Sequence, residues 1–330
     1  MSATEFDIIR RYFTRQQPQR EDVIVGIGDD AALLQVAAGS ELVVCMDTLV
    51  AGVHFPVSTG ASAIGHKALA VNLSDLAAMG AAPAWATLSL TLPDADQDWL
   101  ENFSQAFFRL ADRYDVQLVG GDTTRGPLSV TVQAHGLVPG GKALRRQGAQ
   151  PGDRVYISGT LGDAGLALQL GDAAGSALRQ RLDYPEPRVA TGQLLRDFAS
   201  AAIDVSDGLL ADLGHLLEVD EQGISLGASI NVDALPRSAV FTETLQQAGP
   251  AQQPLFYELP LSAGDDYELC FTVPARSCEA MEAALSNQSI AYSAIGIIEH
   301  ESGIRCHRAN GEPYQPDMTG YRHFGGAGRG

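Results

Sequence analysis

Apolar and polar residues recur with two different periods along this chain, which predicts a mixture of helices and strands. Residues 85–92 and 128–138 alternate apolar and polar side chains, as half-buried strands do. Residues 96–114 repeat large apolar side chains at helical spacing, in a stripe made of Trp99, Phe103, Phe107, Leu110 and Tyr114. Both types of segment are interleaved in both halves, so we expect an α/β fold with mixed sheets in two domains.

Shorter segments extend this pattern along the rest of the chain. We predict short strands at residues 23–27, 116–119, 154–158, 201–205 and 293–298, and a buried strand at residues 41–47. We predict helices at residues 209–219 and 275–286, on both sides of residues 184–188, and at residues 2–15, where Ser2 and Glu5 make a capping box. Residues 263–271 are predicted to form a strand–loop–strand unit.

Residues 62–80 predict a helix that is apolar on nearly every side and is therefore buried. The same helix nevertheless contains Asn72, Ser74 and Asp75. A buried carboxylate needs a partner, and the nearest basic residue upstream, Lys67, lies more than two turns away. A metal ion is therefore a candidate partner for Asp75.

Several other aspartates share one local setting, near the end of an apolar strand and before a turn of small residues. They are Asp29, Asp30, Asp47, Asp122, Asp204 and Asp207. Strand ends in α/β folds face a common crevice, so we expect these carboxylates to gather around Asp75. Oxygen ligands without a His or Cys pattern suit Mg²⁺. For any one of them, and above all for Asp207 in Ser-Asp-Gly, a turn or a helix cap is the alternative interpretation.

The chain length predicts how many domains there are, and the net charge argues against some classes of binding partner. The 330 residues suggest two domains, and Gly/Pro-rich sequence at residues 139–141 and 151–152 marks the junction. We expect an N-terminal domain at residues 1–140 and a C-terminal domain at residues 150–330. The net charge of −18 disfavours nucleic acid and anionic membranes as partners.

The cysteines and the N-terminal segment bear on the compartment. Cys45, Cys270, Cys278 and Cys306 are scattered and form no CxxC pair, which is typical of reduced thiols. The N-terminal segment lacks the apolar core of a signal peptide, and no run of about 18 apolar residues occurs. We therefore expect a cytoplasmic protein without a membrane span.

Two segments imitate phosphate-binding loops. Gly26–Ala31 fits a dinucleotide fingerprint, but two carboxylates would face the pyrophosphate and the segment that follows is too short for the required helix. Gly136–Lys142 fits a P-loop, but Ala143 stands where Ser or Thr should bind Mg²⁺. An NAD enzyme remains an alternative on the first segment alone, and ATP would have to bind in another way.

Two basic residues stand out in this acidic chain. His54 lies in a Gly/Pro loop close to Asp47 in sequence and is a candidate for the site. Arg146 follows Arg145 and is a candidate phosphate clamp, with a solvated turn as the alternative. No Gly-x-Ser-x-Gly or HExxH motif indicates a nucleophile or a zinc site.

Seven motifs in one order resemble the bacterial thiamine-monophosphate kinases, from about residue 4 to residue 324. They are Gly28–Ala31, Asp47–Val50 with Gly52–Phe55, Asn72–Gly80, Gly120–Thr123, Arg146 with Gly148-Ala149, Asp204–Leu209 and Gly264–Leu269. The resemblance implies the fold of the aminoimidazole-ribonucleotide-synthetase superfamily, with an N-terminal domain that forms a β-barrel across a homodimer and a C-terminal domain that closes the active site. It implies phosphorylation of thiamine monophosphate by ATP to give thiamine diphosphate, the last step to the active cofactor.

The resemblance also implies roles for individual residues. It implies Mg²⁺ ligands at Asp30, Asp47, Asp75, Asp122, Asp204 and Asp207, with backbone oxygens of Cys45 and Met46. It implies ATP contacts at Tyr114, Gly121, Asp122, Arg146 and Ser206, and substrate contacts at His54, Asp265 and Tyr321. The family is associated with a potassium requirement, for which these residues give no indication. Gly264-Asp265-Asp266 departs from the Gly-Glu-Asp that we expect in many relatives.

The predicted chemistry is a direct in-line phosphoryl transfer. Several Mg²⁺ ions held by aspartates would screen the repulsion between two phosphate-bearing reactants, so no nucleophile or general base is expected and Asp75 should matter most. One alternative is another member of the superfamily that acts on a purine intermediate, a selenium compound or a hydrogenase-maturation substrate. A second is a non-catalytic acidic module that binds metal or nucleotide.

Overall fold

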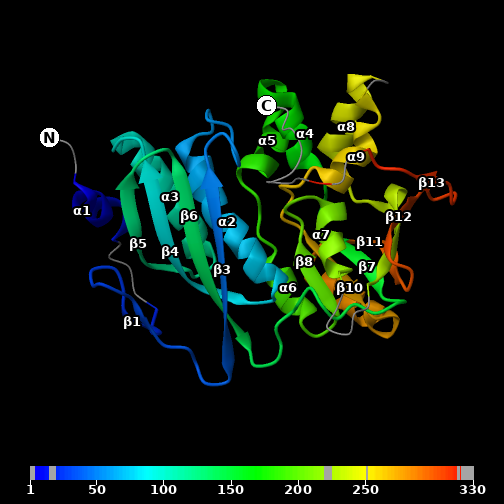
Figure 1. Cartoon of the computed structure of the whole chain (residues 1–330), viewed down its shortest axis with the longest axis horizontal. Helices are drawn as coiled ribbons and strands as arrows, with labels where there is room; N and C mark the ends of the chain where they lie inside the picture. The colour runs from blue at the N-terminus through cyan, green and yellow to red at the C-terminus, as the bar shows by residue number, and fades with distance from the viewer. Residues whose placement is uncertain (1–3, 15–19, 219–224, 250–251, 318–319, 321–330) are drawn as a thin grey trace. The chain divides into compact units, whose positions relative to one another are not determined.

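The computed structural model describes residues 4–14, 20–218, 225–249, 252–317 and 320 (Figure 1). The chain divides into two compact units. The first unit comprises Met1–Ala143 together with Asp183–Val189, and the second comprises Leu144–Leu182 and Ala190–Gly330. The chain therefore returns to the first unit for one short segment between two helices.

The first unit is built on a four-stranded sheet in the order β3-β6-β4-β5. Its elements are α1 (Glu5–Ile8), a π-helical turn (Ile9–Phe13), β1 (Val23–Val25), β2 (Leu33–Leu34), β3 (Ser40–Val50), α2 (Ala61–Ala78), β4 (Ala82–Leu92), α3 (Gln97–Arg113), β5 (Gln117–Arg125) and β6 (Ser129–Pro139). β6 pairs antiparallel with β3 and β4, whereas β4 and β5 run parallel. β1 and β2 form a separate antiparallel ribbon.

Helices α2 and α3 lie together on one face of this sheet (Figure 1). Leu69, Leu73 and Leu76 of α2 are fully buried, which confirms the predicted buried helix. Gly65 allows the close approach of α3, because a Cβ there would lie 2.3 Å from the backbone oxygen of Phe103. The predicted amphipathic helix at residues 96–114 is confirmed as α3.

The opposite face of the sheet is only partly covered. Val23 of the β1–β2 ribbon packs with the buried side chain of Trp85. Along β3 three apolar side chains are 46%, 49% and 62% exposed, namely Leu42, Val44 and Met46. The prediction of a buried strand at residues 41–47 is therefore wrong in its burial, because β3 is an edge strand with an open face. An apolar run does not reveal whether its own chain covers it.

The second unit is built on a seven-stranded sheet in the order β13-β12-β9-β11-β7-β10-β8. Its strands are β7 (Arg154–Ser158), β8 (Ala201–Asp204), β9 (Gly227–Asn231), β10 (Leu269–Val273), β11 (Tyr292–Glu299), β12 (Gly303–His307) and β13 (Pro313–Tyr314). Its helices are α4 (Asp163–Leu170), α5 (Ser176–Asp183), α6 (Val189–Leu195), α7 (Leu209–Leu216), α8 (Ala239–Ala248), α9 (Leu255–Ser262) and α10 (Cys278–Asn287), with short 3-10 turns at Gly171–Ala173, Val232–Ala234 and Ala275–Ser277. β12 pairs parallel with β9, and the other neighbouring strands pair antiparallel. Ile157, Ile203, Leu209, Ile230 and Ile295 belong to its main core cluster.

The sequence prediction of this unit has gaps and one error. β7, β8 and β11 are confirmed to within a residue at each end, whereas β9, β12, α8 and α9 were not predicted. The strand–loop–strand unit at residues 263–271 is wrong, because helix α9 ends at Ser262 and β10 alone follows the loop. Pro260 lies inside α9, and an internal proline argues against a helix when only the sequence is read.

The N-terminal helix begins later than predicted. Thr4 caps α1: its hydroxyl accepts the Asp7 N–H, and the Asp7 carboxylate accepts the Thr4 N–H. The predicted capping box joins Ser2 to Glu5, and Ser2 lies outside the described residues; Glu5 is the first residue of α1. The two boxes overlap in sequence, and the spacing alone does not choose between them.

Among the described residues, no helix is both long and apolar enough to cross a lipid bilayer.

Candidate active site

The first unit brings Asp47 and Asp75 together around the half-buried thiol of Cys45. Cys45 and Asp47 are two residues apart on β3, and α2 packs on this strand. The thiol of Cys45 contacts the backbone oxygen of Asn72 at 3.3 Å. Burial, and then the negative charges of Asp75 and Asp47, raise the pKa of Cys45, so both carboxylates lie close to it. Burial also raises the pKa of Asp47.

The remaining predicted carboxylates of the first unit are exposed. Asp30 lies between β1 and β2, where its N–H donates to the Asp29 carboxylate at 2.8 Å. Asp122 lies inside β5, next to Gly121. At Gly121 a Cβ would lie 1.9 Å from the backbone oxygen of Leu88, so a side chain at this position would prevent the close pairing of β5 with β4. Sequence reasoning assigned Gly121 to ATP alone and missed this packing reason.

The expectation that the aspartates stand at strand ends needs correction. Asp204 is the last residue of β8, but Asp47 and Asp122 lie within β3 and β5. The crevice rule holds for parallel sheets, and most strand pairs here are antiparallel. Antiparallel neighbours place successive strand ends at opposite edges, so the rule does not predict convergence in this fold.

His54 and Tyr114 have defined partners within the first unit. The backbone N–H of Val50 donates to His54 Nδ1 at 3.0 Å, so the ring proton of neutral His54 belongs on Nε2. The hydroxyl of Tyr114 lies 2.9 Å from Glu186 Oε1 and 3.0 Å from the backbone oxygen of Pro187. Burial and the charge of Glu186 raise the pKa of Tyr114. Tyr114 thus binds the short segment that returns from the second unit's helices.

In the second unit, one carboxylate organises the turn that follows β8. Asp212 Oδ2 accepts the backbone N–H groups of Ser206, Asp207 and Gly208 at 3.0, 3.0 and 3.1 Å. Burial, together with the charges of Asp204 and Asp207, raises the pKa of Asp212 to about 7. Sequence reasoning missed Asp212. An Asp in the first turn of a predicted helix directly after Ser-Asp-Gly was the available signal.

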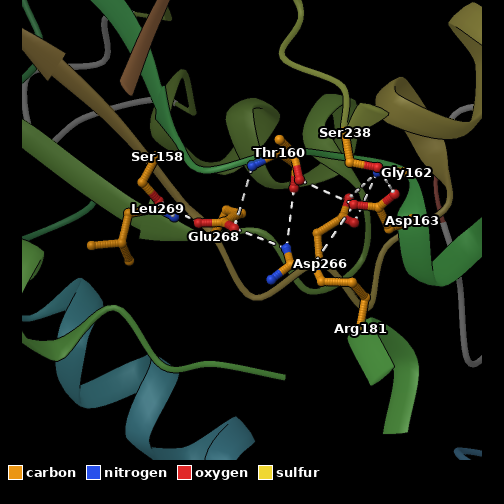
Figure 2. A network of polar contacts seen from close by, with 9 residues as sticks. All are labelled: Ser158, Thr160, Gly162, Asp163, Arg181, Ser238, Asp266, Glu268 and Leu269. Atoms are coloured by element: carbon orange, nitrogen blue, oxygen red, sulfur yellow. Dashed lines mark hydrogen bonds and ion pairs between the residues drawn. The ribbon is translucent and has the colours of Figure 1, made fainter. Parts of the chain in front are cut away.

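Asp265 occupies a loop with an uncommon backbone between α9 and β10. Asp265 and Tyr267 have φ of +58° and +50°. The loop is anchored by buried Asp266 and Glu268, which belong to the polar network in Figure 2 and which sequence reasoning also missed. Non-glycine residues with positive φ are uncommon and concentrate at functional sites.

The network in Figure 2 also decides what the Gly159–Gly165 segment does. The Gly162 N–H donates to both oxygens of Asp266 at 2.9 and 3.1 Å, and the Thr160 N–H donates to Glu268 Oε1 at 3.4 Å. These backbone donors are occupied by carboxylates of the chain itself. The segment therefore serves as a helix-entry turn into α4.

Arg146 and Tyr321 complete the predicted set. Arg146 is exposed. Two residues later, a Cβ added at Gly148 would lie 2.2 Å from the backbone oxygen of Ser200. Tyr321 lies outside the described residues.

The two segments that resemble phosphate-binding loops lack the helix that such loops require. β2 follows Gly26–Ala31, and a turn follows β6 at Gly136–Lys142.

The donor set fits a hard cation in its chemistry. Each predicted side-chain ligand is a carboxylate, and Mg²⁺ prefers oxygen ligands while keeping several waters or phosphate oxygens. In the part of the chain that the structure describes, no group of three or more His, Cys, Asp or Glu side chains is arranged to hold a metal. The structure brings Asp47 and Asp75 close to the Cys45 thiol, and it brings Asp204 and Asp207 close to the Asp212 carboxylate.

Comparison with known proteins gives consistent matches. The family model for the N-terminal domain of AIR synthase related proteins matches residues 28–138. The thiamine-monophosphate kinase of Escherichia coli strain K12 is 48% identical over 332 residues, which covers 98% of this chain and 99% of that protein. The crystal structure of thiamine-monophosphate kinase from Stenotrophomonas maltophilia K279a is 48% identical with a TM-score of 0.80, covering 89% of this chain and 93% of that one. AaThiL complexed with AMPPCP and TMP is 32% identical with a TM-score of 0.74, covering 88% and 89%.

Proposed function

This chain belongs to the thiamine-monophosphate kinase family, and from that premise we propose that it transfers the terminal phosphoryl group of ATP to thiamine monophosphate, giving thiamine diphosphate. The observation that carries the proposal is the 48% identity to a curated thiamine-monophosphate kinase over nearly the whole of both chains. A relative of the same fold has been solved with AMPPCP and TMP, which matches the two substrates proposed.

The aspartates are proposed to hold Mg²⁺. Asp30, Asp47, Asp75 and Asp122 would contribute from the first unit, and Asp204 and Asp207 from the second. Backbone carbonyls of Cys45 and Met46 are proposed as further ligands from the family resemblance. β3 is an edge strand, so alternate residues direct their carbonyls away from β6, and one of these two neighbours does so. Bound Mg²⁺ would neutralise phosphate oxygens and reduce the repulsion between the two reactants. K⁺ is proposed as an additional requirement from the family resemblance alone.

The chain's own residues are proposed to bind and orient the reactants. Arg146 and Ser206, together with Tyr114 and Gly121, would contact ATP. His54 Nε2–H would donate to the substrate while Nδ1 stays fixed by the Val50 N–H. Asp265 and Tyr321 would complete the substrate contacts.

The reaction is proposed to be a direct in-line transfer. The acceptor phosphate of thiamine monophosphate is largely ionised at neutral pH, because its second pKa is about 6. No general base and no covalent enzyme intermediate are then required. Positioning and charge neutralisation supply the rate enhancement.

The first unit is proposed to form a homodimer through the open face of its sheet, closing a barrel with its partner. The exposed side chains of Leu42, Val44 and Met46 lie along the uncovered edge strand. Contiguous exposed apolar surface of this kind marks an interaction site. We also propose a cytoplasmic location, supported by cysteines that are free in the structure.

The test is an ADP-release assay with ATP, Mg²⁺ and thiamine monophosphate, with the product identified by mass. Thiamine diphosphate should form, and it should disappear when EDTA is added or when thiamine monophosphate is omitted. ATP binding without this product would indicate a different acceptor within the superfamily. Mg²⁺-dependent nucleotide binding without ADP release from any acceptor would instead indicate a non-catalytic module.

A further inference from the structure

The loop that carries Asp265 has a backbone that its own sequence does not favour. Gly264, Asp265 and Tyr267 all have left-handed φ, of +70°, +58° and +50°. For residues with a Cβ this region is unfavourable, and such a backbone persists only where the surrounding structure holds it. The contacts that hold this loop therefore control where the Asp265 carboxylate lies.

The alternate residues of the loop point inward and are fixed. Asp266 and Glu268 are 4% and 0% exposed. Asp266 accepts the Gly162 N–H with both carboxylate oxygens, and Glu268 Oε2 accepts the Ser158 hydroxyl at 2.7 Å. Gly159 makes room for this carboxylate, because a Cβ there would lie 2.1 Å from Glu268 Oε1.

Arg181 of α5 supplies the positive charge in this network (Figure 2). Its Nη2 donates to Glu268 Oε1 at 2.9 Å, and its Nε lies 3.7 Å from Asp163 Oδ2. Both carboxylate side chains are fully buried. The same guanidinium donates to the backbone oxygen of Thr160 at 3.3 Å, so it also ties down the helix-entry turn.

The other side of the loop contacts the turn after β8. The Asp265 N–H donates to the Ser206 backbone oxygen at 2.9 Å, and the Tyr267 N–H donates to the Val205 backbone oxygen at 2.9 Å. The Tyr267 hydroxyl donates to Asp265 Oδ1 at 3.1 Å, which orients the carboxylate. The turn itself has a separate anchor in Asp212.

We propose that Arg181 is a positioning residue for the phosphoryl acceptor. By compensating Glu268 and Asp163, it holds residues 264–268 in the left-handed backbone that presents Asp265. This inference rests on the proposed function, in which Asp265 contacts thiamine monophosphate. Without Arg181, two buried carboxylates lose their cation and move toward water, and the loop relaxes with them.

The kinetic test compares Arg181→Met with a control of similar stability. Arg181→Met should raise KM for thiamine monophosphate about tenfold or more, while KM for ATP changes less than about threefold because Asp212 holds the ATP-side turn independently. Arg181→Lys keeps the charge and should show a smaller rise. Leu285→Ala empties a fully buried site on α10 outside the network and should lower Tm without this change in KM.

A double variant separates charge compensation from simple loss of packing. Glu268→Gln added to Arg181→Met removes the charge that Arg181 compensates and keeps one side-chain oxygen as an acceptor for the Ser158 hydroxyl or the Thr160 N–H, so KM for thiamine monophosphate should return toward the wild-type value. No recovery, or an equal rise of KM in Leu285→Ala, would overturn the proposal.

Hydrogen exchange makes the inference independent of turnover. In the unliganded protein, Arg181→Met should speed exchange in peptides covering residues 264–268 more than Leu285→Ala does. If wild type makes no thiamine diphosphate but this difference appears, the proposed function fails while the structural role of Arg181 stands. If wild type is active and the two variants exchange alike at this loop, the positioning role is refuted.

Discussion

Gly120 and Gly121 are neighbours on β5, yet the structure tolerates a side chain at only one of them. A Cβ on Gly120 would meet nothing closer than the Thr87 methyl carbon at 3.9 Å. A Cβ on Gly121, where φ is +151°, would lie 1.9 Å from the Leu88 backbone oxygen. Gly121→Ala should therefore lower the free energy of unfolding by about 1–3 kcal/mol or more, as overpacking does.

Urea denaturation of both alanine variants checks this prediction. Gly120→Ala is the matched control and should unfold close to wild type. Equal midpoints for the two variants would show that β5 can shift away from Leu88. In that case Gly121 would not be required by strand packing.

Replacing Asp75 is expected to lower the reaction rate more than replacing His54. Asp75→Asn should lower kcat on the order of 100-fold, the scale for losing one group that stabilises charge in a transition state. His54→Asn keeps an acceptor near Nδ1 for the Val50 N–H and should mainly raise KM for thiamine monophosphate. Steady-state kinetics at saturating Mg²⁺ measure both. Near wild-type activity in Asp75→Asn would contradict the proposed metal role.

At the scale of elements, the segment Asp183–Val189 is bound to the helices of the first unit. His66 Nε2 on α2 lies 2.9 Å from the Pro185 backbone oxygen, and Arg113 Nη1 at the end of α3 donates to Glu186 at 2.8 Å. Burial lowers the pKa of His66 below its ordinary value of 6.5, and the hydrogen bond to Pro185 only partly offsets this. The neutral ring is the form that the fold accommodates.

This pKa shift predicts how stability depends on pH. Above pH 6.5 His66 is neutral in both the folded and the unfolded chain, so its contribution is fully present. As pH falls below 6.5, the unfolded chain binds the proton first and the free energy of unfolding decreases. His66→Gln keeps a donor for Pro185 and does not titrate. Urea midpoints at pH 7 and pH 5 should therefore fall less for His66→Gln than for wild type, and equal falls would contradict the prediction.

At the scale of the whole molecule, the exposed face of β3 predicts self-association. Val44→Asp places a charge among the exposed side chains of Leu42 and Met46 and should convert a dimer to a monomer. Val57→Asp changes an apolar side chain that is 80% exposed outside the sheet, and it should leave the dimer intact. Sedimentation velocity distinguishes the species. A monomeric wild type would refute the proposed dimer, and dissociation by both variants would remove β3 as its location.

Local periodicity predicted the long elements well because a long helix or strand repeats its apolar spacing often enough to be recognised. Helices α2 and α3 and strands β4 and β6 follow their apolar patterns closely. Helix α9 was missed because Pro260 obscured it, and β9 and β12 are too short and polar to stand out. Seven ordered motifs sufficed to indicate the family, while the roles of single residues within them stay predictions.

The sequence by itself determined the family, the aspartate-rich chemistry and the helices and strands whose apolar periods are long. Only the tertiary structure decided which of these groups meet. Asp212 accepting three N–H groups, and Arg181 joining Glu268 to Asp163, link residues that are 4 to 87 positions apart. It also showed that β3 is open on one face. Hydrogen bonds and burial depend on distance in space, and linear order does not encode which distant segments pack together.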